Sequence, residues 1–166
     1  MLHWAKAQTG QIIYKPEKIN LATIIKEVLQ ISSSIAKIKN ITLNYIQSDA
    51  IEVYTDVNML KIVLRNLISN AIKFTNPNGK IEVSAIQNQN HIEITVSDNG
   101  VGMNEETRNK LFKIDSTIIT TGTAAEKGSG LGLILCKEFV EKQRGEIWVE
   151  SKLGKGSDFK FTLPLN

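Results

Sequence analysis

The chain has 166 residues, of which 42% are apolar and 22% charged, a composition typical of one globular domain with its own core. A net charge of +3 on scattered lysines gives no basic tract for nucleic acid, and the single cysteine, Cys136, excludes an internal disulfide and favours a reducing compartment. No apolar run could span a bilayer, and the first ten residues lack the apolar centre of a signal peptide, so we expect a cytoplasmic protein.

The first part of the chain is predicted to contain two helices and several short extended segments. Residues 1–9 have the pattern of a helix end, and residues 11–20 are extended. Asn20 can cap a helix over 21–38. Apolar spacing predicts that the buried side of this helix consists of Leu21, Ile24, Ile25, Val28, Leu29, Ile31 and Ile35.

Alternating residues at 41–47 and 51–55 predict two strands, and Asp56 can cap a second long helix over 57–74. The rest of the chain is predicted to contain, in order, a hairpin at 79–98 turning near Asn88, a short helix at 104–112, a helix at 130–143, and a closing hairpin at 145–165. Residues 113–129 have no clear periodicity. This order indicates an α+β fold with helices on one face of a mostly antiparallel sheet.

A line of polar residues runs along the helix predicted at 57–74. Asn66, Asn70 and Lys73 are four and three residues apart, so they stack beside one another at the border of the apolar stripe. An amide oxygen there could face a metal ion and a lysine could face phosphate. Taken alone, the same pattern also fits a solvated polar edge.

Two glycine-containing segments add to this pattern. The first, "SDNGVGM", brings Asp98 from a strand into a turn with Gly100 and Gly102, where a carboxylate could accept a hydrogen bond from an exocyclic amine. The second, "GSGLGL", leads into an apolar helix whose free amides favour phosphate. The alternatives are a plain Asp-Asn-Gly turn and a flexible hinge.

Together these segments resemble the catalytic ATP-binding domain of sensor histidine kinases, within the GHKL ATPase superfamily. "NLISNAIKFT" is similar to the N box, "DNGVGM" to the first glycine box, "GSGLGL" to the second, and "KLF" to a reduced F box. The resemblance extends from about residue 16 through the closing hairpin. It implies a two-layer α/β sandwich with a mixed sheet. The F box departs from the family pattern, because Ile114 and Asp115 stand where a Pro-Phe pair is frequent.

The resemblance also implies ATP and Mg²⁺ as ligands and assigns roles to the residues. Asn70 would hold the metal ion, Asn66 and Lys73 would contact phosphates, and Asp98 would bind the adenine amine. The glycine boxes would add Gly100 and Gly102 at the adenine pocket and Gly128, Gly130, Leu131 and Gly132 at the phosphate end. Residues 113–127 would form a lid over the nucleotide.

The hydrolases of the superfamily place a glutamate base four residues before the metal-binding asparagine. Here that position is Asn66, and an amide cannot take a proton at neutral pH. The resemblance therefore implies that the γ-phosphoryl group goes to an outside acceptor, a histidine on a dimerisation domain. Neither His3 nor His91 matches the acceptor motif.

Residues 1–10 resemble the end of the dimerisation-domain helix, and residues 11–166 the catalytic domain. We therefore expect a monomeric fragment of a homodimeric parent, which a segment outside this chain could anchor to a membrane. The expected partners are its own dimerisation domain and a response regulator, but not nucleic acid. Two alternatives stay open: a serine kinase of the anti-sigma-factor type, and a catalytically silent nucleotide-binding module.

Overall fold

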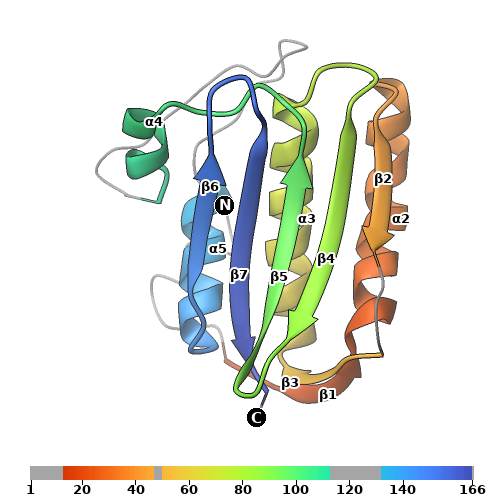
Figure 1. The fold of residues 1–166 in the computed structure, drawn as a ribbon. Helices are drawn as coiled ribbons and strands as arrows, with labels where there is room; N and C mark the ends of the chain where they lie inside the picture. Colours follow the sequence, from red (N-terminus) through yellow and green to blue (C-terminus); the bar gives the residue numbers. More distant parts are fainter. Residues whose placement is uncertain (1–12, 47–49, 113–131, 166) are drawn as a thin grey trace.

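A computed structural model describes residues 13–46, 50–112 and 132–165. Its main element is a five-stranded sheet in the order β2-β4-β5-β7-β6 (Figure 1). The strands are β2 (Thr42–Ile46), β4 (Lys80–Gln87), β5 (His91–Asp98), β6 (Ile147–Ser151) and β7 (Ser157–Pro164). β2 and β4 are parallel and the other neighbours antiparallel, so the predicted mixed, mostly antiparallel sheet is confirmed.

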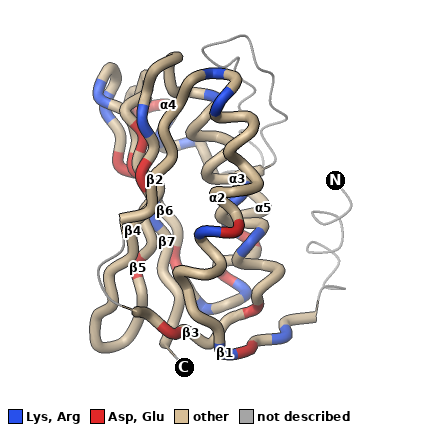
Figure 2. Tube along the Cα trace, turned by 90° about the vertical axis from the view of Figure 1, so that its right-hand side faces the viewer, with Lys and Arg blue, Asp and Glu red and all other residues tan. Residues whose placement is uncertain are grey.

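Three helices cover one face of this sheet, and the side view shows two separate layers (Figure 2). They are α2 (Leu21–Ile38), α3 (Val57–Phe74) and α5 (Gly132–Lys142). Two short strands, β1 (Glu17–Asn20) and β3 (Glu52–Thr55), pair antiparallel beside the layers. The short helix α4 (Glu105–Lys110) has no buried residue.

The core lies between the two layers because each central strand alternates buried and outward residues. β5 buries Ile92, Ile94 and Val96, and β7 buries Phe159, Phe161 and Leu163. The helices begin where their caps were predicted. The Asn20 side chain accepts a hydrogen bond from the Thr23 N–H (3.3 Å), and the Asp56 side chain accepts one from the Met59 N–H (3.1 Å).

The predicted buried side of α2 is wrong at its C-terminal end. Ile31 and Ile35 are 64% and 56% exposed, whereas Ser32 and Ala36 face the core. Burial follows a narrow line at spacings of four residues, which continues from Val28 to Ser32 and Ala36. The apolar spacing predicted a stripe that is wider than the surface actually covered.

Candidate functional site

α3 carries the predicted polar line on the border of its buried stripe. Asn66, Asn70 and Lys73 are each half-buried, whereas the neighbouring Leu67 and Ala71 are buried in the core. The ammonium of Lys73 lies 4.9 Å from the centroid of the Phe74 ring, a cation–π distance. All three side chains therefore lie at the edge of the helix layer, between core and surface.

The start of α5 lies against the middle of α3. A side chain added at Gly132, the first residue of α5, would lie 3.7 Å from the amide group of Asn66. One turn further on, the buried Cys136 thiol lies 3.7 Å from the carbonyl oxygen of Val63. Burial raises the pKa of Cys136 to about 12, although an interaction with the Asn66 side chain opposes this. The last glycine of the second glycine box and the first asparagine of the N box are thus neighbours.

Asp98 is the last residue of β5, as predicted, and only 8% of it is exposed. Its Oδ1 atom accepts a hydrogen bond from the Gly100 N–H at 2.9 Å. Burial raises the pKa of Asp98 to about 6, although the backbone amides of Gly100 and Ser157 act in the opposite direction. A buried carboxylate of this kind is a strong acceptor for a donor group that enters the same space.

The loop after Asp98 is fixed on one side by the C-terminal end of α3. The Val101 N–H donates to the Phe74 carbonyl oxygen at 3.1 Å. A Cβ atom at Gly100 would lie 2.2 Å from the same oxygen, so only glycine fits. The same helix therefore contacts the second glycine box at Asn66 and the first glycine box at Phe74.

On its other side, the loop is fixed by the turn between β6 and β7. Gly102 has a φ of +68°, and a Cβ atom there would lie 2.0 Å from the Lys152 carbonyl oxygen. A Cβ atom at Gly156 would lie 2.1 Å from the carbonyl oxygen of Asp98. These glycines are required by contact between two backbones, a role that the sequence pattern did not indicate.

Sequence reasoning also missed Lys39, which is 92% buried beside the end of α3. Its ammonium donates to the carbonyl oxygens of Ile72 and Lys73 at 2.9 and 3.0 Å. These are among the last carbonyls of the helix, where a cation is favoured. No local signal marks this lysine, because its partners lie 33 and 34 residues away in the sequence.

The remaining predicted site residues, Gly128, Gly130 and Leu131, lie outside the described residues, as does the lid predicted at 113–127. Within the described ranges, no group of three or more His, Cys, Asp or Glu side chains could hold a metal ion. In the same ranges no helix is both long enough and apolar enough to cross a membrane.

Comparison with known proteins gives a consistent result. Residues 55–166 match the family described as histidine kinase-, DNA gyrase B-, and HSP90-like ATPase. The adaptive-response sensory kinase SasA of Prochlorococcus marinus (strain MIT 9215) is 34% identical over 157 residues, which cover 93% of this chain and 42% of that kinase. The chain therefore spans less than half the length of this curated relative.

Two solved structures share the fold. The catalytic domain of histidine kinase ThkA superposes with a TM-score of 0.78 at 30% identity, covering 91% of this chain and 96% of that domain. A structure of ThkA in complex with the response regulator TrrA gives a TM-score of 0.79 at 25% identity, covering 99% of this chain and 47% of that kinase chain.

Proposed function

The chain belongs to the family of histidine kinase-, DNA gyrase B- and HSP90-like ATPases, and from this we propose that it binds Mg-ATP and donates the γ-phosphoryl group to a histidine of a sensor-kinase dimerisation domain. The observation that supports this most is the arrangement along α3. Asn66 contacts Gly132, and Phe74 contacts the loop that follows Asp98. These two positions on α3 are about two helical turns, or roughly 12 Å, apart. This separation suits an elongated ligand with a base at one end and phosphates at the other.

Asp98 would read the adenine ring. Its buried carboxylate would accept a hydrogen bond from the exocyclic amine. Gly100 and Gly102, which fit against the backbones of α3 and of the β6–β7 turn, would shape the adenine pocket by fixing the loop that follows Asp98. A base without that amine would leave a buried acceptor without its partner, which is costly. Asp98 therefore supplies both affinity and selection for adenine.

The half-buried line on α3 would hold the triphosphate end. Asn70 presents a neutral amide oxygen, a ligand type that Mg²⁺ accepts alongside waters and phosphate oxygens, and Asn66 and Lys73 would contact the phosphates. Mg²⁺ would neutralise charge that develops on the transferred group. Gly128, Gly130, Leu131 and Gly132 would add backbone amides, and residues 113–127 would close over the nucleotide.

The site favours transfer over hydrolysis. Asn66 occupies the position of the hydrolases' glutamate and offers no base to water, so its amide can orient phosphate but not activate a nucleophile. In the transfer step, a histidine nitrogen forms a bond to the γ-phosphorus while the bridging P–O bond breaks and ADP leaves. Catalysis would come from positioning and charge stabilisation.

This proposal makes the chain the catalytic part of a longer, homodimeric, cytoplasmic or membrane-anchored kinase. Residues 1–10 would continue a dimerisation-domain helix, and residues 11–166 would form the catalytic domain, monomeric on its own. The phosphorylated histidine would then supply a response regulator, the kind of partner seen with ThkA.

The test is to mix the chain, Mg²⁺ and γ-labelled ATP with a separately produced dimerisation domain of the same parent. We expect acid-labile, alkali-stable label on that domain, the behaviour of a phosphohistidine. Acid-stable label on a serine would indicate the serine-kinase alternative. ATP binding with no transfer at all would indicate the silent module.

A further inference from the structure

We infer that Ser151 is a positioning residue for adenine recognition, because it holds the loop of Asp98 from the side opposite to α3. This inference rests on the proposed nucleotide function. Ser151 is the last residue of β6, and the turn that follows it packs against residues 98–103. Ser151 lies outside the N box and both glycine boxes, and it would not contact the nucleotide.

All the hydrogen-bonding capacity of the Ser151 hydroxyl is used inside the protein. The Oγ atom accepts a hydrogen bond from the Met103 N–H at 2.9 Å and donates to the Gly156 carbonyl oxygen at 2.9 Å. The Ser157 hydroxyl lies 2.8 Å away and is the donor in the arrangement that satisfies every group. Only 8% of Ser151 is exposed, so water cannot easily take the place of its hydroxyl, and losing it would leave buried groups without a hydrogen bond.

These partners lie at both ends of the loop that carries Asp98. Met103 is where the loop leaves the first glycine box. Gly156 packs on the Asp98 carbonyl oxygen, and Ser157 pairs with Asp98 across β5 and β7. The Ser151 hydroxyl therefore connects the end of the loop, at Met103, to the first residue of β7, which pairs with Asp98 at the start of the loop. Phe74 of α3 contacts the opposite side of the loop.

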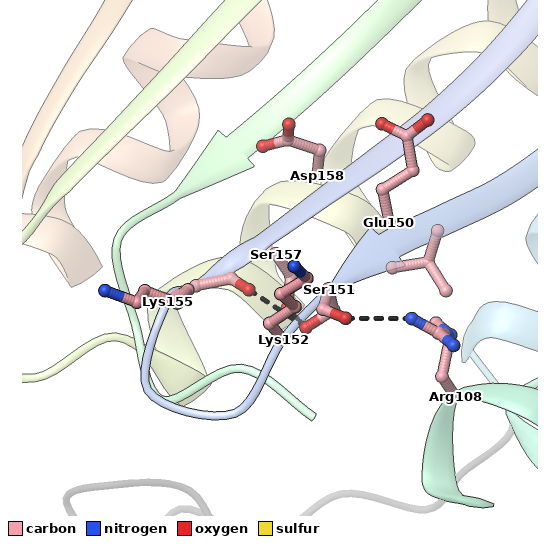
Figure 3. Close-up of a pocket in the computed structure, with 9 residues that line it drawn as sticks. Arg108, Glu150, Ser151, Lys152, Lys155, Ser157 and Asp158 are labelled. Carbon is pink, nitrogen blue, oxygen red and sulfur yellow. Dashed lines mark hydrogen bonds between the residues drawn. The ribbon is translucent and has the colours of Figure 1, made fainter. Parts of the chain in front are cut away.

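A further contact fixes Ser151 itself. Its carbonyl oxygen accepts a hydrogen bond from the Arg108 guanidinium of α4 at 2.9 Å, which Figure 3 shows at the edge of an open depression of about 500 Å³. The depression is lined by Arg108 of α4, the C-terminal end of β6, the turn and the N-terminal end of β7. None of the residues predicted to bind the nucleotide lines it. Ser151 thus sits where β6, α4, the turn and the Asp98 loop meet.

The competing interpretation is that Ser151 only stabilises the fold. The two interpretations differ in selectivity. A positioning residue affects the part of the ligand that Asp98 reads, and its effect disappears when Asp98 is absent. A residue that only adds stability changes the unfolding temperature but leaves the ratio of affinities for different bases unchanged.

The experiment is titration calorimetry of the folded chain with Mg-ATP and with Mg-ITP, a purine triphosphate without the exocyclic amine. Ser151→Ala should weaken ATP binding about tenfold and ITP binding by less than about threefold. Ser97→Ala is the matched control, because Ser97 precedes Asp98 but its hydroxyl bonds to Asp158 on the outer face of the sheet. Its affinities should equal those of the wild type. If Ser151→Ala does not fold, Ser151→Cys carries the same test, since a thiol is a weak hydrogen-bonding group of similar shape.

The double variant Ser151→Ala with Asp98→Ala completes the cycle and should bind ATP no more weakly than Asp98→Ala alone. Unchanged ATP affinity in Ser151→Ala, equal losses for ATP and ITP, or additive losses in the double variant would each overturn the inference. Failure of the proposed function would look different: the wild type would not bind ATP, or Asp98→Ala would bind it normally.

Discussion

At the scale of single residues, the proposed role of Asp98 in binding adenine comes with a cost to the stability of the fold. Its pKa is raised from 3.8 to about 6 by burial, so the native state binds this proton more tightly than the unfolded state. The destabilisation caused by burying the ionised carboxylate is absent below about pH 4, grows as the pH rises towards 6, and is complete above that pH. A pKa difference of this size corresponds to at most about 3 kcal/mol.

Asp98→Asn should therefore raise the free energy of unfolding at pH 7 by about 1–2 kcal/mol, because the amide keeps the Gly100 hydrogen bond without a buried charge. Urea unfolding of wild type and variant between pH 4 and 8 measures this, and the difference should shrink below pH 5. The same variant should bind ATP about tenfold more weakly, since a neutral acceptor replaces a charged one. If the stability of Asp98→Asn relative to the wild type were lower at pH 7 than at pH 5, the raised pKa of Asp98 would be contradicted.

Single residues also show where sequence reasoning succeeds and where it stops. The positions of Asp98 at a strand end, and of Asn66, Asn70 and Lys73 on the border of a stripe, follow from local periods of two and 3.6 residues. The contacts of Ser151 do not, because its partner Met103 is 48 residues distant. Residues whose importance comes from distant backbone contacts leave no local signal.

At the scale of elements, the C-terminal end of α3 depends on the lysine that follows α2. Lys39→Met should lower the free energy of unfolding by about 2 kcal/mol, because it removes a charged donor from the carbonyl groups of Lys73 and Ile72. The Ile72 carbonyl also accepts a longer hydrogen bond from the Thr75 N–H (3.4 Å). Lys37→Met is the control: it lies in the last turn of α2 but is exposed, so its effect should be within about 0.5 kcal/mol. Equal effects in denaturant unfolding would argue against a role for the Lys39 ammonium.

The contact between the first glycine loop and the β6–β7 turn gives a second comparison of elements. Gly102 and Gly154 both have positive φ, but an added Cβ meets the Lys152 carbonyl at Gly102 and nothing within 4 Å at Gly154. Gly154→Ala should cost about 1 kcal/mol from backbone strain alone. Gly102→Ala should cost about 3 kcal/mol or more and weaken ATP binding, because the loop must shift. Similar thermal unfolding of the two variants would show that the backbone contact is not tight.

The limits of α2, α3 and α4 were predictable to within about two residues, because caps and apolar periods are local. The burial of the C-terminal half of α2 was not, since it depends on how closely that half approaches its neighbours, and here Ser32 and Ala36 face the core in place of Ile31 and Ile35. The strand order was likewise beyond local patterns. The parallel pairing of β2 with β4 joins segments that are separated by β3 and α3.

At the scale of the whole molecule, the length of the sheet separates His91 from the proposed nucleotide site. His91 begins β5 and Asp98 ends it, so the strand places them roughly 23 Å apart at opposite ends of the sheet. The His91 ring also contacts the Asn88 side chain at 2.7 Å in the hairpin turn. His3 lies outside the described residues. We therefore expect the isolated chain to bind ATP without labelling itself at His91, as mass spectrometry after incubation with γ-labelled ATP would verify.

The same geometry predicts how the molecule responds to a general base. Asn66 sits beside Gly132 at the proposed phosphate end, so Asn66→Glu would place a carboxylate where the related hydrolases have theirs. A well-placed base contributes about 10²–10⁴-fold. Because the neighbouring Cys136 is buried and cannot help to position an attacking water molecule, we expect phosphate release to rise only about tenfold to a hundredfold. Asn66→Gln, with the same length and no base, should stay at the slow rate of the wild type. Rapid hydrolysis by the wild type, or equal rates for the two variants, would show that the asparagine is not what directs the phosphoryl group away from water.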